Sequence, residues 1–280
     1  MNNFYKLNIR NSESHKGENG RVLVIAGSKK YPGAGLIASE AGLRSGADLV
    51  YLMAPRFVTD KIINPSIIPV PLQGDHLERK HIVKFSEISK NIDSVVIGPG
   101  ITESSGVKTF ISEFLIRNKL PVVIDADALK LISLSQLSKM KNVMLTPHKK
   151  EFMKLFKQEA NIKRCRERAS FEKNIVICLK GKEDYVTDEK HIYINKSGNA
   201  GLTVGGTGDT LAGMIGSFIA QGNSLYQSAK TGVYVLGKTG DKLFSKYGYN
   251  YTVKEILEIL PKEVKRFNSP QINFFKKIIG

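Results

Sequence analysis

Short runs of β-branched and other apolar residues, each followed by glycine or aspartate, recur in this chain and alternate with helical patterns. Six such runs predict buried strands, at residues 21–26, 48–53, 93–97, 122–125, 143–146 and 175–179. Helical patterns separate them, for example at residues 36–44 and 107–117. Because this alternation requires crossover connections, it predicts an α/β fold with a mostly parallel sheet that helices cover on both faces.

The pattern changes after the sixth run. Residues 184–187 and 191–194 flank a polar turn and predict an antiparallel hairpin at the sheet edge. A helix is then expected to open at Asp209 and to end near Gly222. Its apolar face is formed by residues at helical spacing, Leu211, Met214, Ile215, Phe218 and Ile219.

Two more helices are predicted toward the C-terminus, at residues 224–247 and 253–260, and Pro261 is expected to end the second. Residues 265–280 form an extra tail, which either docks on the body or on a neighbouring subunit, or frays. A length of 280 residues suits one large α/β unit, so we expect a single domain over residues 1–280.

The chain carries 42 Lys and Arg against 26 Asp and Glu, a formal net charge of +16. Such a surplus favours polyanionic partners, including nucleic acid, anionic membrane and phosphorylated ligands. The basic residues are dispersed, however, as on a solvated surface. We therefore expect no nucleic-acid or membrane partner, and a nucleic-acid-binding protein on a kinase-like fold remains an alternative.

Cys165 and Cys178 lie in unrelated contexts without metal-type spacing, so neither a disulfide framework nor a zinc site is indicated. The N-terminus lacks the apolar core of a signal peptide, and no stretch has the length of a membrane-spanning helix. These features predict a cytoplasmic protein.

Functional residues of a parallel sheet lie at the carboxyl ends of the strands, where loops meet helix N-termini. Here small or polar sequences follow the predicted strands and should converge on one rim. They are Gly27-Ser28, Gly98-Pro99-Gly100, Asp125-Ala126-Asp127, Thr146-Pro147-His148 and Lys180-Gly181.

The run Gly205-Gly206-Thr207-Gly208 is the strongest signal for an anion site, because small residues let the backbone approach a phosphate while N–H groups of the helix start point at it. Asp209 follows in the first helical turn, where the helix dipole should keep it ionised as a general base. The alternative is an aspartate that only caps a helix after a glycine-rich turn.

Other polar residues of the rim allow two interpretations each. Asp125 and Asp127 are candidates for Mg²⁺, or else form Asx turns, and we prefer the turn for a solvent-facing Asp127. His148 either donates a hydrogen bond to a ligand or caps the helix at 149–156. Lys180 either binds phosphate or is solvated.

Taken together, these positions resemble the ADP/ATP-dependent NAD(P)H-hydrate dehydratase family, which is related to ribokinase-like kinases. The resemblance covers roughly residues 15–222. Its motifs are His15-Lys16-Gly17, Ala26-Gly27-Ser28, Gly33-Ala34, Gly98-Pro99-Gly100, Asp125-Ala126-Asp127-Ala128-Leu129, Thr146-Pro147-His148, Leu179-Lys180-Gly181, Gly198-Asn199, and Gly205 to Leu211 with Ala212-Gly213. It implies a ribokinase-like three-layer sandwich.

By resemblance, the reaction phosphorylates the hydroxyl of hydrated NADH or NADPH and then eliminates phosphate, with Mg²⁺ and with ADP or ATP as co-substrate. The catalytic residues implied are Asp209, Gly206, Thr207 and Gly208. The nucleotide contacts implied are Lys180, Gly181, Lys182, Glu183, Asp184 and Gly208. The contacts implied for the hydrated cofactor are Ala34, Gly100, His148, Asn199 and Asp209.

Some residues depart from the family pattern. Asp184 stands where the family usually carries threonine, and its charge would repel nucleotide phosphates unless it points away or meets Mg²⁺. Ala200 and Thr203-Val204 also differ, which should alter fit more than chemistry. By analogy we expect a homo-oligomer, a tetramer or larger, and if the cell has an epimerase we expect it to be a separate protein. The nearest rival function is a vitamin-alcohol kinase of the same superfamily.

Overall fold

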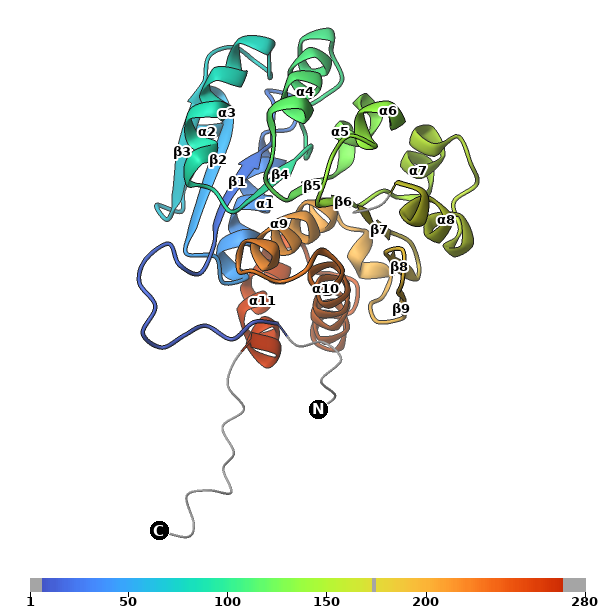
Figure 1. Ribbon diagram of the computed structural model, residues 1–280. Coiled ribbons are helices and arrows are strands. Elements are labelled where there is room, and N and C mark those ends of the chain that lie inside the picture. The colour runs from blue at the N-terminus through green and yellow to red at the C-terminus, as the bar shows by residue number, and fades with distance from the viewer. Residues whose placement is uncertain (1–6, 173–174, 269–280) are drawn as a thin grey trace.

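The computed structural model describes residues 7–172 and 175–268, and within them a single sheet of nine strands forms the centre (Figure 1). The strand order is β3-β2-β1-β4-β5-β6-β7-β8-β9, parallel as far as β7 and antiparallel for the last two. The bounds are β1 Arg21–Ile25, β2 Leu49–Pro55, β3 Ile67–Leu72, β4 Ser94–Ile97, β5 Val122–Ile124, β6 Val143–Leu145, β7 Ile175–Leu179, β8 Asp184–Thr187 and β9 Ile192–Asn195. The predicted α/β class and the edge hairpin are confirmed.

Helices pack on both faces of the sheet (Figure 1). One face carries α1 Pro32–Arg44, α2 Arg56–Thr59, α9 Thr207–Ala220, α10 Leu225–Tyr247 and α11 Val253–Asn268. The other carries α3 Ile82–Ile88, α4 Ser105–Arg117, α5 Ala126–Leu131, α6 Leu134–Leu137, α7 Lys149–Phe156 and α8 Ile162–Glu172. Short 3₁₀ segments are η2 Arg79–His81, η3 Ser89–Asn91 and η4 Ala200–Thr203.

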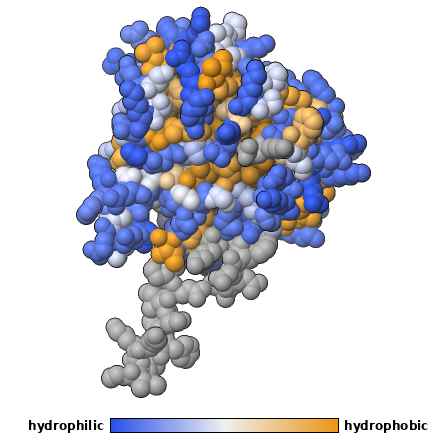
Figure 2. All heavy atoms as spheres, in the orientation of Figure 1, coloured by the Kyte–Doolittle hydropathy of each residue, from blue (hydrophilic) through white to orange (hydrophobic). Residues whose placement is uncertain are grey.

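The strands are apolar throughout because both of their faces are buried. In β1, Val22 and Val24 belong to the core beneath α1 and α9, while Leu23 and Ile25 belong to the core on the opposite face. Continuous apolar runs, rather than alternation, are typical of such parallel strands. On the side shown in Figure 2, hydrophilic residues cover much of the surface, with apolar residues visible between them.

One strand was not predicted and one predicted helix end was wrong. The edge strand β3 contains Pro69 and Pro71, and proline is tolerated at a sheet edge. Helix α11 does not end at Pro261 but continues to Asn268. Its buried face persists beyond the proline, at Val264, so packing offsets the lost helical hydrogen bond.

Residues 265–268 of the expected tail form the end of α11, and residues 269–280 lie outside the described part of the chain. Among the described residues, no helix combines the length and the apolar composition that a bilayer crossing requires.

The contact between α1 and α9 depends on a glycine. A Cβ placed on Gly213 of α9 would overlap the carbonyl oxygen of Ala38 in α1. Gly213→Ala should therefore lower the free energy of unfolding by about 1–3 kcal/mol, because the two backbones must separate. Gly33→Ala is the matched control, since a Cβ at Gly33 meets nothing within 4 Å. Equal denaturation midpoints in urea for both variants would contradict this packing argument.

Candidate functional site

Three loops at the carboxyl ends of adjacent strands meet as predicted. Asp125 follows β5, Thr146 follows β6 and Lys180 follows β7. The Lys180 Nζ atom lies 2.6 Å from Asp125 Oδ1, and the Thr146 hydroxyl donates to the same oxygen at 2.7 Å. The Asp125 side chain is only 2% exposed, so this ion pair is almost shielded from water.

The predicted glycine turn lies directly before α9. Gly206 is the N-cap, with a φ of +96°. A Cβ at this position would lie 2.8 Å from Ile37 Cδ1 and 3.1 Å from Val253 Cγ2. A residue with a side chain would therefore be strained in this backbone conformation and would not fit the space. The Thr207 N–H donates to the Val204 carbonyl oxygen at 3.4 Å, so the other N–H groups of this helix start are the candidates for an anion.

Lys180 brings a positive charge to this turn. Its Nζ atom would lie 3.6 Å from a Cβ built on Gly208, so the ammonium group stands beside the first turn of α9. Burial disfavours the ammonium form, but the Asp125 carboxylate outweighs burial and the pKa of Lys180 lies above its usual value. Lys180 is therefore a permanently charged group at the turn.

Asp209 occupies the first turn of α9, as predicted, but its ionisation differs from the expectation. Burial, followed by the negative charge of Asp125, raises the pKa of Asp209 to about 7, and the charge of Lys180 only partly opposes this. The helix dipole alone predicted a fully ionised carboxylate. A pKa near 7 suits a general base better, because a neutral-pH base works best when its pKa is close to the working pH.

Asp127 is less exposed than we expected when we preferred an Asx turn for it. Its side chain is 16% exposed, accepts a hydrogen bond from the Thr102 amide at 3.1 Å and pairs with Lys130 at 2.7 Å. It therefore holds the loop that follows β4. In that loop, a Cβ on Gly100 would lie 2.8 Å from Ala34 Cβ, so these two predicted contacts of the hydrated cofactor are neighbours.

A cavity of about 920 Å³ lies beside the glycine turn. Its walls come from the β7–β8 turn, the segment 196–204, the start of α9 and one side of α10. The predicted site residues that line it are Lys180, Gly181, Lys182, Glu183, Asp184, Thr207, Gly208, His148 and Asn199. The cavity thus brings together the nucleotide contacts that the sequence suggested, and it adds His148 and Asn199 to them.

Asp184 lines the cavity, and its carboxylate is hydrogen-bonded within the protein. Its carboxylate accepts hydrogen bonds from the Gly181 amide and from Asn195 Nδ2, both at 3.1 Å. Burial raises the pKa of Asp184, and the hydrogen bonds from Asn195 and Gly181 oppose this rise. The aspartate at this unusual position therefore closes the β7–β8 turn.

His148 caps α7, as one of its two interpretations predicted. Its Nδ1 accepts from the Glu151 amide at 3.2 Å, and Glu151 Oε2 accepts from the His148 amide at 2.9 Å. The imidazole is half exposed and lines the cavity, so a ligand contact stays a prediction. Sequence reasoning missed Glu151, a buried carboxylate whose pKa burial raises, although its spacing from His148 is that of a capping box.

The described residues offer no ready-made metal centre, because no group of three or more His, Cys, Asp or Glu side chains could hold an ion. One oxygen of Asp125 is already engaged by Lys180 and Thr146. Mg²⁺ commonly binds through one or two carboxylates together with substrate phosphates and water. A role of Asp125 in holding Mg²⁺ stays a prediction.

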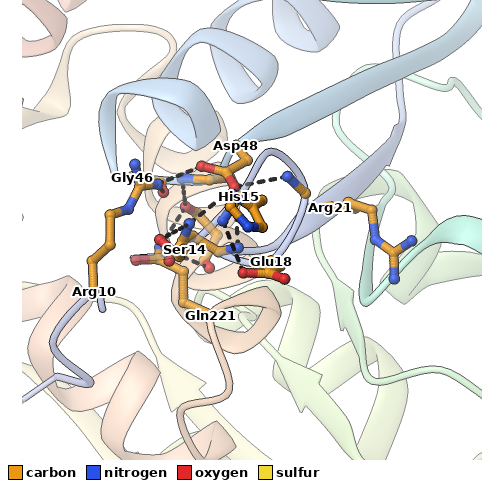
Figure 3. Close-up of polar contacts among 12 residues, drawn as sticks. Arg10, Ser14, His15, Glu18, Arg21, Gly46, Asp48 and Gln221 are labelled. Carbon is orange, nitrogen blue, oxygen red and sulfur yellow. Dashed lines mark hydrogen bonds and ion pairs between the residues drawn. The ribbon is translucent and has the colours of Figure 1, made fainter. Parts of the chain in front are cut away.

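The motif His15-Lys16-Gly17 lies away from this rim, because it precedes β1 and so lies at the amino ends of the parallel strands. The Asp48 carboxylate fixes it by accepting from the amides of Gly17 at 2.9 Å and Asn19 at 3.1 Å. Figure 3 shows Arg10 and Asp48 in the same polar cluster. The geometry assigns this motif to the anchoring of the N-terminal segment.

Residues 22–262 match the family model of NAD(P)H-hydrate dehydratase. The chain is similar to the bifunctional NAD(P)H-hydrate repair enzyme Nnr of Methanocaldococcus jannaschii, at 40% identity over 93% of this chain and 51% of that protein. It is similar to the ADP-dependent (S)-NAD(P)H-hydrate dehydratase of Cenarchaeum symbiosum, at 36% identity over 92% of this chain and 93% of that protein.

Among solved structures, the chain is similar to the ADP/ATP-dependent NAD(P)H-hydrate dehydratase of Bacillus subtilis, co-crystallised with ATP and Mg²⁺. The TM-score is 0.78 at 27% identity, over 94% of this chain and 95% of that one. The chain spans about half the length of the bifunctional relatives that it matches. These similarities favour a dehydratase over the vitamin-alcohol kinase alternative.

Proposed function

The chain belongs to the NAD(P)H-hydrate dehydratase family, and from that premise we propose that it converts hydrated NADH or NADPH back to the intact cofactor in a nucleotide-dependent reaction. The observation that carries the proposal is the position of Asp209. This carboxylate lies in the first turn of α9, directly after Gly208, which lines the cavity and lies beside the Lys180 ammonium group. A base at this position would be close to a phosphoryl group bound at the glycine turn.

In the proposed reaction, Asp209 accepts the proton of the hydrate hydroxyl while that oxygen attacks the terminal phosphoryl group of the nucleotide. The bond from this phosphoryl group to the nucleotide breaks. The amides of Gly206, Thr207 and Gly208 and the Lys180 ammonium stabilise the charge that is transferred. Elimination then breaks the carbon–oxygen bond, releases phosphate and a proton from the neighbouring carbon, and restores the dihydronicotinamide ring.

We propose ADP as the co-substrate, with AMP and phosphate as products, because the similar protein of Cenarchaeum symbiosum is named ADP-dependent. Mg²⁺ would arrive with the nucleotide and neutralise part of its phosphate charge. A cytoplasmic homo-oligomer completes the proposal.

The direct test is to incubate the purified chain with hydrated NADH and ADP, and to follow the near-ultraviolet absorbance of NADH as it reappears. Parallel reactions contain ATP in place of ADP, no nucleotide, or EDTA. We expect recovery of NADH that requires a nucleotide and stops with EDTA. Phosphorylation of a vitamin alcohol without recovery of NADH would overturn the proposal.

The reaction rate should depend on pH through Asp209. Its pKa of about 7 means that the carboxylate is protonated, and unable to act as a base, at lower pH. We expect kcat/KM to fall about tenfold per pH unit below 7 and to level off above it. Initial rates in buffers of constant ionic strength measure this profile. A flat profile between about pH 5.5 and pH 7 would remove Asp209 from the role of base.

A further inference from the structure

The loop between β4 and α4, residues 98–104, has an unusual backbone conformation. Gly98, Gly100 and Thr102 have φ values of +127°, +64° and +66°, all in the left-handed region. Glycine adopts this region readily, whereas a β-branched residue such as Thr102 is strained in it. Such strain persists only where the surrounding structure holds it, and it is concentrated at functional sites. The contacts that hold Thr102 are therefore a guide to the role of this loop.

One carboxylate holds Thr102 in place. Asp127 Oδ2 accepts from the Thr102 amide at 3.1 Å, and Asp127 Oδ1 accepts from Lys130 Nζ at 2.7 Å. The Asp127 side chain is only 16% exposed, so water competes little with this charge-assisted hydrogen bond. Asp127 itself lies in the first turn of α5, after the neighbouring strand β5. The start of α5 therefore fixes the conformation of the loop after β4.

A second carboxylate connects the same loop to two lysines. Glu103 pairs with Lys154 of α7 at 3.0 Å and with Lys130 of α5 at 3.3 Å. Its side chain is 44% exposed, and ion pairs that are open to water contribute little to stability. Asp127 is therefore the stronger of the two restraints on the loop.

The loop packs against the segment that leads into α1. The Gly27 amide donates to the Pro99 carbonyl oxygen at 2.7 Å. A Cβ on Gly100 would lie 2.9 Å from the Tyr31 carbonyl oxygen and 2.8 Å from Ala34 Cβ, so only a glycine fits here. Gly100 and Ala34 are both predicted contacts of the hydrated cofactor. A change in the loop conformation would therefore separate two predicted parts of one binding site.

We propose that Asp127 is a positioning residue for the hydrated cofactor, because its carboxylate holds Thr102 in the conformation that keeps Gly100 against Ala34. The inference rests on the proposed function, since the hydrate is the ligand that we assign to Gly100 and Ala34. Asp127 is not among the residues that line the cavity beside the glycine turn. Its loss should therefore weaken binding of the hydrate and leave binding of ADP unchanged.

Binding of hydrated NADH, measured by calorimetry without nucleotide, tests the proposal. Asp127→Ala should raise the Kd of the hydrate about tenfold, because the strained Thr102 amide loses a charged acceptor. Asp127→Asn keeps an oxygen that can accept from Thr102, so its Kd should stay within about threefold of the wild-type value. An unchanged hydrate Kd in Asp127→Ala, or an equal loss of affinity for ADP, would overturn the proposal.

A substitution at Thr102 separates positioning from other effects of Asp127. Glycine adopts the left-handed conformation without strain, so Thr102→Gly should restore most of the hydrate affinity that Asp127→Ala loses. Asn142→Gly is the matched control, because Asn142 has a φ of +57° but precedes β6, at the amino ends of the strands. It should restore nothing. Equal recovery with both glycine substitutions, or recovery with neither, would exclude an action of Asp127 through Thr102.

Asp48→Ala controls for a general loss of stability. The Asp48 side chain is 11% exposed and also accepts from backbone amides, those of Gly17 and Asn19, away from the rim. This variant should have a lower melting temperature and an unchanged hydrate Kd. If it weakens hydrate binding as much as Asp127→Ala does, the proposal is wrong.

These outcomes are distinct from a failure of the proposed function. A wild-type chain that binds the hydrate but does not regenerate NADH would refute the dehydratase activity and leave the comparison of the variants valid. An active wild-type chain with the same hydrate KM as Asp127→Ala would refute only the positioning role. A wild-type chain without affinity for the hydrate would overturn both.

Discussion

Asp209→Asn should reduce turnover of hydrated NADH by about 10²–10⁴-fold, the usual contribution of a positioned general base. The amide has the size of the carboxylate but cannot accept the hydroxyl proton. Because Lys180 and the glycine turn remain, the affinity for ADP should change little. Steady-state kinetics and calorimetry measure the two effects separately, and near-normal turnover would exclude Asp209 as the base.

The same substitution should stabilise the protein at alkaline pH. The folded-state pKa of Asp209, about 7, lies above its ordinary value of 3.8, so the folded protein binds this proton more tightly than the unfolded chain. Ionisation of Asp209 therefore costs stability progressively between about pH 4 and pH 7, and in full above pH 7. We expect a higher melting temperature for Asp209→Asn at pH 8, and a difference that largely disappears near pH 4. A lower melting temperature of Asp209→Asn than of the wild-type chain at pH 8 would contradict the claim that burial disfavours the ionised Asp209 carboxylate.

The rim of the site could be predicted because strand direction alone determines where its loops meet. Asp125, Thr146 and Lys180 each follow an apolar strand, and the parallel sheet brings them within hydrogen-bonding distance. The glycine turn and Asp209 were equally visible, since the helix that follows them has a clear apolar face. What the motifs could not show is which ligand each loop faces, as the cavity position of Asn199 illustrates.

Other features depend on contacts between segments that are distant in sequence. The pKa of Asp209 reflects burial and the charge of Asp125, 84 positions earlier in the chain by their numbers, whereas only the local helix dipole could be read from the sequence. Asp184 was expected to repel nucleotide phosphates, because the sequence does not show that Asn195, on a different strand, donates a hydrogen bond to its carboxylate. Pro261 was taken as a helix end because the packing that carries α11 past it could not be seen.

The second large effect concerns the ion pair beneath the site. Asp125→Ala should lower the free energy of unfolding by about 3–5 kcal/mol, because it leaves the Lys180 ammonium largely buried and unpaired. The Thr146 hydroxyl loses its carboxylate acceptor in the same step. Asp75→Ala is the matched control, since the Lys29–Asp75 pair is exposed, at 62% and 63%, and its loss should cost less than about 1 kcal/mol.

Adding Lys180→Met to Asp125→Ala should restore most of the lost stability, because the cost arises from a stranded charge and not from the missing carboxylate itself. Activity should not return with stability, since the ammonium beside Gly208 is then absent from the phosphate site. Urea unfolding and turnover, measured on the same two variants, separate these roles. If the double variant is as unstable as Asp125→Ala alone, the ion pair contributes through packing, and Lys180 need not be charged to hold the site together.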